Sequence, residues 1–403
     1  MTIIVDRYAK LVHKLIRTAT IGVGAIAGPG VLFVLPFILP MQQFSVLAAV
    51  LATSQLIGVL GAFSLDVSCP RLGINLGHAA VYSCWTVLLA SFVVFISLSM
   101  SLTSEFVMAI LLAWILLLSN IFHSYSLFAG RAKIYGTIGF FKALFFLMVF
   151  VVFIYCGISP EIAWLSASIA GLLTAFLLLM LSWRVKNVGK EGNAGLKEII
   201  EFSLPSALIV ASGSLPFVID RVIALNWLST TDFARYTVCV TWAVPIIYVG
   251  NIAEKSIISN SESESLQTII YWLSGIFVAC IAYITVLSLL VKYVIMVPYF
   301  TNNDEFLHKW WLISGWFTVY TAIHNPSFAY IQKNYTAIQL KQLAYKVVVS
   351  LGIVLLVCFL VSYCYDIKNV IDNKVNAIIL FSALLATVSV WAKINHVIRH
   401  LKR

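Results

Sequence analysis

The sequence predicts an all-α, polytopic membrane protein with about twelve transmembrane helices in two six-helix lobes. The 403 residues are 61% hydrophobic and only 10% charged, which is too apolar for a water-soluble globular domain. Apolar stretches of about 20 residues, long enough to cross about 30 Å of hydrocarbon as a helix, recur along the whole chain. The strands of a membrane barrel are shorter and alternate in polarity, so helices are expected.

Twelve apolar windows define the predicted helices. The first six lie near residues 18–39, 44–65, 79–100, 104–125, 138–158 and 161–183. The second six lie near residues 200–227, 233–254, 267–290, 309–331, 343–365 and 375–397. A polar, glycine-bearing stretch at 184–197 separates the two sets. We therefore predict an N-terminal lobe over 1–190 and a C-terminal lobe over 191–403.

The basic residues predict the orientation of these helices. Most of the 26 Lys and Arg residues fall at the N-terminus, in the even-numbered loops or at the last helix end, where Lys393 and Arg399 lie. Because cytoplasmic loops carry the excess of positive charge, both termini are expected in the cytoplasm. The bases are spread over short loops and are not gathered on one surface, so no nucleic-acid partner is expected.

The sequence contains no pattern for a metal or a cofactor. Its seven cysteines lie in or beside apolar segments, without a Cys-x-x-Cys pair and without histidines at a spacing suited to zinc. We interpret them as small apolar residues of the core. No metal, cofactor or catalytic residue is predicted.

Two of the predicted helices are interrupted by glycine and proline at corresponding places. The first contains Gly24 and Pro29 and the seventh contains Gly213 and Pro216, and aligning the two halves places Gly24 on Gly213. Proline removes a backbone hydrogen bond, so both helices should bend, and bent helices in matching positions favour a gating role. The alternative is that these small residues only permit close helix packing.

A family resemblance enters at the start of the second half. Residues 200–205 (Ile-Glu-Phe-Ser-Leu-Pro), 217–223 (Phe-Val-Ile-Asp-Arg-Val-Ile) and 233–236 (Phe-Ala-Arg-Tyr) resemble this region of Wzx-type polysaccharide flippases, which belong to the MOP exporter superfamily. Ala234-Arg235 departs from the pattern, which has a small glycine before the tyrosine. The match implies the fold more strongly than the substrate.

The resemblance implies a flippase and not an enzyme. Such a protein would move a polyprenyl-diphosphate-linked oligosaccharide, the repeat unit of an O-antigen, lipopolysaccharide or capsule, from the inner to the outer leaflet by alternating access. The resemblance also implies a bacterial inner membrane as its location. Its expected partners are that undecaprenyl-diphosphate-linked substrate and membrane lipids. A contact with the polysaccharide polymerase machinery is left open.

Charged residues near the outer end of the seventh helix are candidate substrate ligands. Asp220 and Arg221 lie near the outer end of the seventh helix, and Arg235 near the start of the eighth. An arginine facing a cavity would attract a diphosphate through its fork of donors. The alternative is that Arg221 extends to the outer headgroups while Asp220 pairs with Arg235.

Further candidates lie nearer the inner end of the bundle. Lys142 could place an ammonium in a central cavity, and Arg131 and Lys133 could receive the diphosphate at the inner mouth, although topology alone also explains these bases. His324 and Asn325, before a proline, could line the path. His123 is interpreted as a packed, hydrogen-bonded histidine, and the inner helix ends with Asp66, Glu254 and Lys255 as interfacial.

Two other functions compete with the flippase. An ion-coupled multidrug exporter of the same superfamily would need an acidic group deep in the first lobe, and no charged residue occurs between Arg17 and Phe44. A membrane polysaccharide polymerase or glycosyltransferase would need a substantial charged external loop, whereas the first external turn, 40–44, is short and uncharged.

Overall fold

Long helices account for almost all of the structure. The computed structural model describes residues 32–97, 103–128, 132–183, 196–258, 266–364 and 374–401, and these ranges contain helices and no strand. Residues 32–38 form the described part of the first predicted helix. The other helices are α2 (Met41–Gly61), α3 (Leu65–Arg71), α4 (Leu76–Ser97), α5 (Ser104–Phe128), α6 (Ala132–Tyr155), α7 (Pro160–Trp183), α8 (Leu196–Ser214), α9 (Pro216–Trp227), α10 (Thr230–Ile258), α11 (Leu266–Tyr293), α12 (Asn303–Asn334), α13 (Ala337–Cys364) and α15 (Lys374–Leu401).

The predicted windows coincide with these helices. Each window from residue 44 onward matches a described helix, with the seventh divided into α8 and α9. Within the described ranges, 8 helices are long and apolar enough to cross a membrane, and the bent pair α8–α9 makes a ninth. The short helix α3 was not predicted, because its seven residues fall below the length that a window detects.

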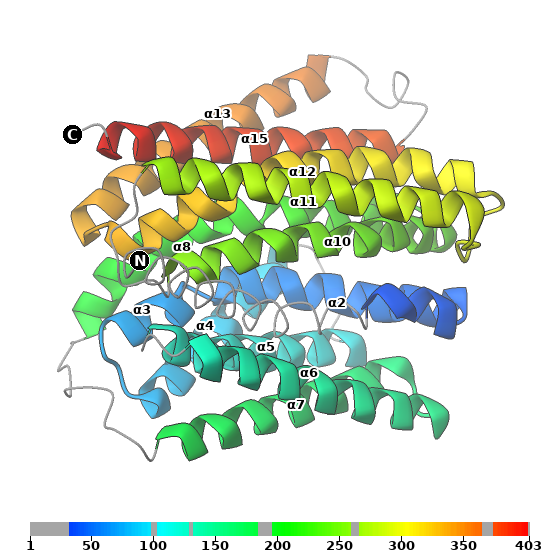
Figure 1. The fold of residues 1–403 in the computed structure, drawn as a ribbon, viewed down its shortest axis with the longest axis horizontal. Coiled ribbons are helices and arrows are strands. Elements are labelled where there is room, and N and C mark those ends of the chain that lie inside the picture. The colour runs from blue at the N-terminus through cyan, green and yellow to red at the C-terminus, as the bar shows by residue number, and fades with distance from the viewer. Residues whose placement is uncertain are drawn as a thin grey trace, which may run out of the picture.

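The helices form two groups, and most of them run in roughly the same direction (Figure 1). Helices α4 to α7 pack with α2 on one side, and α10 to α15 lie on the other, with α2 between the groups. The all-α, multi-pass fold class with two lobes is therefore confirmed. The boundary between the lobes at residue 190 stays a prediction, because residues 184–195 are outside the described ranges.

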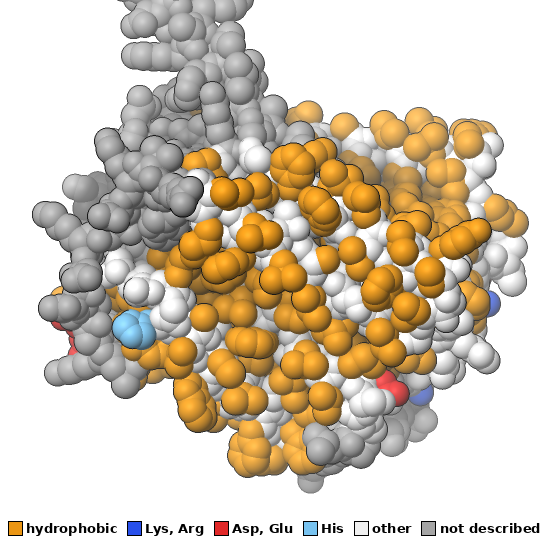
Figure 2. All heavy atoms as spheres, turned by 90° about the horizontal axis from the view of Figure 1, so that it is seen from below, with side chains coloured by type: hydrophobic (Ala, Val, Ile, Leu, Met, Phe, Trp, Pro, Cys, Tyr) orange, Lys and Arg blue, Asp and Glu red, His pale blue; other side chains and the backbone are white. Residues whose placement is uncertain are grey.

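The outer surface of the helices is apolar, as expected for contact with lipid tails. Figure 2 shows a face covered by hydrophobic side chains, with the few visible charged ones near its margins. Large apolar residues stay exposed along α4, α6 and α7, including Trp85, Phe92, Val152 and Leu181. A soluble monomer rarely exposes so wide an apolar surface.

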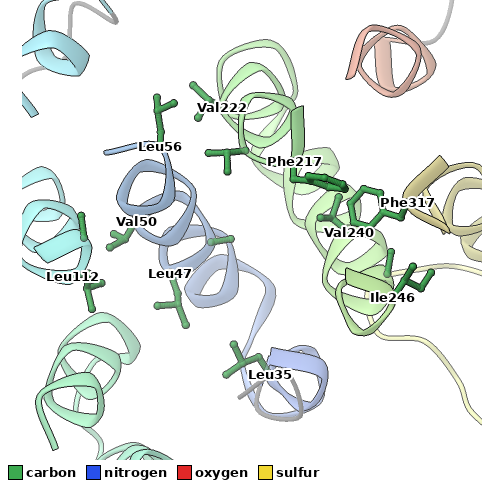
Figure 3. Close-up of a cluster of buried hydrophobic side chains, with 14 of the residues drawn as sticks. Leu35, Leu47, Val50, Leu56, Leu112, Phe217, Val222, Val240, Ile246 and Phe317 are labelled. Atoms are coloured by element: carbon green, nitrogen blue, oxygen red, sulfur yellow. The ribbon is translucent and has the colours of Figure 1, made fainter. Parts of the chain in front are cut away.

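A buried apolar cluster joins the two groups across the middle of the molecule (Figure 3). Leu56 of α2 lies across from Val222 of α9, and Val50 of α2 points toward Leu112 of α5. This cluster fills part of the interface between the lobes with mostly apolar side chains. The polar cavities described below lie beside it.

A proline breaks the seventh span. Helix α8 ends at Ser214, α9 begins with Pro216, and the two helices meet at a bend of 57°. Proline fits the first turn of a helix but cannot continue the preceding one, so the chain bends here. The predicted bend of the seventh helix is confirmed, whereas its use as a gate stays a prediction.

The two ends of the bundle are distinguished by charge. We call the end that carries Arg71 and Lys255 the inner end, because the distribution of basic residues predicts that it faces the cytoplasm. The opposite end, with the turn that contains Tyr299, is the outer end.

Candidate functional site

Two adjoining cavities lie between the lobes. The larger has a volume of about 460 Å³ and the smaller about 180 Å³. Five residues line both cavities, namely Leu32, Leu51, Gln55, Tyr248 and Asn251. Because the walls are shared, the two cavities form one region, which we call the central cavity.

The wall of the central cavity is unusually polar for the interior of a membrane protein. Asn120, His123 and Ser124 of α5 line it at helical spacing, so one face of this otherwise apolar helix is polar. Lys142 from α6 and Ser168 from α7 complete this side. The spacing of these three α5 residues is the sequence signal for the polar face, and Asn120 and Ser124 were not among the predicted candidates.

Several buried polar atoms of this wall have no hydrogen-bond partner among the described residues. They include Gln55 Oε1, Ser119 Oγ, His123 Nε2 and Ser168 Oγ in the larger cavity and Thr237 Oγ1 in the smaller one. Nearly all buried polar groups of proteins are hydrogen-bonded, so these atoms require water or a ligand. His123 was interpreted as a hydrogen-bonded packing residue, and this is wrong for its Nε2 atom, which has no partner among the described residues.

Lys142 enters the larger cavity without a protein partner. Its stem packs on α7 at Gly171, where a Cβ would lie 3.2 Å from Lys142 Cγ. The described residues offer its ammonium no hydrogen bond or ion pair, so it can bind an anion in the cavity. The structure brings Lys142 to the predicted place.

Arg221 lines the smaller cavity from α9. Its Nη2 donates to the carbonyl oxygen of Phe217 at 2.6 Å, and its Nε lies 3.8 Å from Asp220 Oδ1. Asp220 is fully buried and accepts a hydrogen bond of 2.7 Å from the hydroxyl of Tyr236. Arg221 faces the cavity, whereas Asp220 anchors α9 to α10 through Tyr236. The two predicted residues therefore differ in role.

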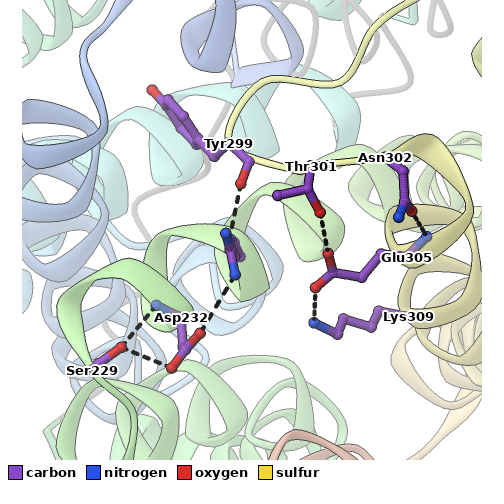
Figure 4. Close-up of polar contacts among 8 residues, drawn as sticks. Ser229, Asp232, Tyr299, Thr301, Asn302, Glu305 and Lys309 are labelled. Atoms are coloured by element: carbon purple, nitrogen blue, oxygen red, sulfur yellow. Dashed lines mark hydrogen bonds and ion pairs between the residues drawn. The ribbon is translucent and has the colours of Figure 1, made fainter.

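Arg235 is not part of the cavity wall and lies at the outer end, where it contacts Asp232 and Tyr299, which Figure 4 labels. Its Nε donates to the carbonyl oxygen of Tyr299 at 2.9 Å, and its Nη1 lies 4.0 Å from Asp232 Oδ1. Asp220 pairs with Arg221 and not with Arg235, so the predicted alternative of an Asp220–Arg235 pair is wrong. Arg235 fastens the turn before α12 to the start of α10.

The acidic and basic residues at the inner helix ends line the cavity as well. Asp66 from α3 and Lys255 from α10 both contribute to its wall, and Lys255 Nζ lies 3.1 Å from Glu254 Oε1. The carboxylate of Asp66 has no basic side chain at ion-pair distance within the described part of the chain. The interpretation of these residues as interfacial is corrected, because α3 folds back against α5 and α8 and turns Asp66 inward.

His324 and Asn325 are buried on α12. Asn325 Nδ2 donates to Asn251 Oδ1 at 2.9 Å and to Glu254 Oε2 at 3.1 Å. Through Asn251 it reaches the wall of the central cavity, whereas His324 stacks with Tyr320 and Phe328 inside the C-terminal lobe. The structure thus places Asn325 behind the wall and His324 away from it.

Four predicted residues cannot be located. Arg131, Gly24 and Pro29 are outside the described residues, and the side chain of Lys133 is not described. Gly213 and Pro216, at the bend between α8 and α9, are described above. No group of His, Cys, Asp and Glu side chains suited to a metal ion occurs among the described residues.

One basic residue lies where the charge pattern did not predict it. Lys393 was assigned to the inner surface, but its side chain is entirely buried in the C-terminal lobe. The sequence did not indicate this burial. Lys393 lies one turn before the end of the predicted helix 375–397, where a lysine usually extends to the headgroups. Its surroundings are described below.

These features define a multi-pass membrane protein with a charged cavity between two helical lobes, an arrangement that is typical of transporters. No protein-family model and no curated protein matches the chain.

Solved structures match it over nearly its whole length. An outward-facing multidrug resistance MATE family transporter of the MOP superfamily has a TM-score of 0.59 and 14% identity, covering 96% of both chains. A MATE in complex with MaL6 has a TM-score of 0.60 and 14% identity, again covering 96% of both chains. The MATE multidrug transporter DinF-BH, solved with a bound ligand, has a TM-score of 0.59 and 15% identity, covering 98% of this chain and 95% of that one. The chain therefore shares the fold of these transporters.

Proposed function

We propose that the protein is an alternating-access exporter whose central cavity binds the anionic head of a lipid-linked substrate. The observation that carries the proposal is the unpaired ammonium of Lys142 in a cavity whose wall also contains Arg221. Charge in the interior of a membrane protein is costly and marks a transport path more often than a structural role. The substrate class that the family resemblance implies, a polyprenyl-diphosphate-linked oligosaccharide, supplies such an anion.

The basic groups stand at successive positions along the cavity. Lys255 is near the inner end of α10, Lys142 lies further along α6, and Arg221 is in the middle of α9, the outer part of the seventh span. A diphosphate could pass from one group to the next while its polyprenyl chain stays in the bilayer, because only the polar head is rejected by hydrocarbon. No covalent chemistry is required.

The size of the cavity limits what it holds at one time. Its larger part, about 460 Å³, is within the range of about 300–1,000 Å³ that is usual for pockets of small ligands. It could hold a diphosphate with the nearest sugar, and a longer oligosaccharide would require the lobes to separate further.

Multidrug export is a second candidate, and Asp66 favours it. This carboxylate lines the same cavity without an ion-pair partner among the described residues and could attract a cationic drug. Two of the structural neighbours are named multidrug transporters, although a likeness at 14% and 15% identity concerns the fold alone.

Paired variants in a deletion strain of the host distinguish the two candidates. For the flippase, Lys142→Ala should lower surface polysaccharide about tenfold or more, as expected for the loss of a charged hydrogen bond, and Asp66→Asn should have a smaller effect. For the drug exporter, Asp66→Asn should abolish efflux of the cationic dye ethidium and Lys142→Ala should spare it. Lys346→Ala, at an exposed site on α13, is the matched control. Equal polysaccharide levels in Lys142→Ala and Lys346→Ala would contradict the leading proposal.

A further inference from the structure

Lys393 is a fully buried lysine that has no acidic partner. It lies on α15 in the C-terminal lobe, and its side chain has an exposed fraction of 0%. Its Nζ lies 3.5 Å from Nδ1 of His324 on α12, and 5.8 Å from the centre of the Phe328 ring. No carboxylate lies at ion-pair distance from it within the described part of the chain.

The closeness of these two basic groups limits their charge. An isolated ammonium in an apolar interior is very costly, and a second positive charge on an imidazole 3.5 Å away would add repulsion. The aromatic face of Phe328 favours one cation at this place but not two. The pair can therefore hold one proton, with either Lys393 or His324 as its carrier.

The imidazole is held in a fixed position. His324 stacks with Tyr320 at a ring-centroid distance of 4.7 Å and with Phe328 at 5.3 Å. The hydroxyl of Tyr320 donates to the carbonyl oxygen of Gly213 on α8, and a Cβ at Gly213 would lie 2.8 Å from His324 Nε2. A glycine is thus required to admit the ring, which leaves Nδ1 facing Lys393.

Other titratable groups on the packed helices are occupied or remote. On α15 itself, His396 Nδ1 lies 2.9 Å from the hydroxyl of Tyr335. On α10, Glu254 is held by Asn325 and Lys255. The groups on α8 and α13 and at the two ends of α15 are exposed, namely Glu198, Glu201, Lys341, Tyr345, Lys346, Lys374 and Arg399. Asp220 pairs with Arg221 on α9, and Glu305 pairs with Lys309 on α12. The other titratable groups of α12 are Asp304, His308, Tyr320, Tyr330 and Lys333.

Helix α12 connects this pair to the central cavity. Asn325, the residue after His324, binds Asn251 and Glu254 behind the cavity wall. The next residue, Pro326, lies inside α12 and removes one of its backbone hydrogen bonds, which leaves the helix easier to bend here. A change of charge at His324 therefore acts directly beside a weak point of the helix that supports the cavity.

We propose that Lys393 and His324 form a proton-binding site and that the binding of a proton there, by bending α12 at Pro326, changes the packing of the two lobes. The inference rests on the proposed exporter function but requires neither substrate class. The proton would then be the coupling ion for export, which the residues of the central cavity do not indicate.

A titration of the whole protein in lipid nanodiscs tests the site directly. Lysine labelled at 13Cε and histidine labelled at 15N would be followed by NMR, with Lys393→Met and Lys393→Gln used to assign the Lys393 signal. We expect the Lys393 and His324 signals to change together in one step, as coupled groups do, and His324→Gln to move the Lys393 midpoint. Lys346→Met should change neither signal. Two independent steps, or an unmoved midpoint in His324→Gln, would overturn the site.

A second measurement tests the coupling to the lobes. A single cysteine at Ser206→Cys, on a background without native cysteines, reports access to the contact between α3 and α8, where Ser206 meets Ser64. We expect its labelling rate to differ about fivefold or more between about pH 6 and pH 8, and Lys393→Met to abolish that difference. The same pH dependence in Lys393→Met would contradict the coupling. Because no substrate is present, a failure here is separate from a failure of the export assay.

Discussion

The guanidinium of Arg71, in the N-terminal half of the chain, binds the backbone at the end of α12 in the C-terminal half. Its Nη2 donates to the carbonyl oxygen of Tyr335 at 2.9 Å, and its Nη1 donates to that of Gln332. The guanidinium carbon also lies 4.9 Å above the Phe202 ring of α8. Because these carbonyls are among those left free at a helix end, one side chain both caps α12 and joins the lobes.

Arg71→Ala should loosen this inner contact. Hydrogen bonds to a charged group contribute about 1.5–3 kcal/mol, so the closed arrangement should lose a large part of its stability. Labelling of a cysteine at Ser206→Cys should become faster, while labelling of one at Phe44→Cys, near Tyr299 at the outer end, should not. An unchanged rate at position 206 would show that Arg71 does not hold the lobes together.

Gly250→Ala should destabilise the protein because α12 lies directly against α10 at this position. A Cβ there would lie 2.8 Å from Asn325 Oδ1, closer than real Cβ contacts. Overpacking typically costs about 1–3 kcal/mol, so the melting temperature in detergent should fall. Gly275→Ala on α11, where nothing lies within 4 Å, is the control and should not lower it. Equal melting temperatures would contradict the close packing of α10 and α12.

Asp220→Asn should be far more harmful than Asp232→Asn. Asp220 is fully buried and bound to Tyr236 and Arg221, whereas the side chain of Asp232 is 52% exposed. Breaking a buried ion pair costs about 3–5 kcal/mol, and exposed pairs contribute about 0–1 kcal/mol. The yield of folded protein and its melting temperature measure the difference. Similar values for the two variants would remove the anchoring role of Asp220.

Arg221→Ala should reduce export by more than its effect on folding explains, because it removes both the ion-pair partner of Asp220 and a cationic group of the cavity wall. Its side chain lines the cavity, and removing it deletes a phosphate ligand in the proposed path. We expect at least about a tenfold loss of surface polysaccharide per amount of folded protein. Lys393 is an unsuitable control because it is buried, so the exposed Lys346→Ala is used. Full export by Arg221→Ala would remove it from the substrate site.

The arrangement of the helices could be predicted from the sequence because lipid imposes a strong and simple pattern. The apolar windows located the helices, and Pro216 located the bend of the seventh span. The short helix α3 was missed because seven residues do not produce a window. The domain boundary and the orientation of the termini stay predictions.

The candidate site could be predicted only in part. Lys142 and Arg221 were proposed because charges within apolar helices are rare, and both line the cavity. The inward position of Asp66 depends on how α3 folds back, and the burial of Lys393 depends on how α12 and α15 pack. Both are tertiary contacts between distant segments, which no local pattern in one sequence reveals.

The most direct test of the proposed function is the leaflet distribution of the lipid-linked oligosaccharide after deletion of the gene in its own host. The account predicts that surface polysaccharide is lost and that complete undecaprenyl-diphosphate-linked repeat units accumulate on the cytoplasmic leaflet. Restoration by the wild-type gene and by Lys346→Ala, but not by Lys142→Ala, would link the defect to the cavity. A normal distribution between the leaflets in the deletion strain would contradict the flippase and leave drug export as the better explanation.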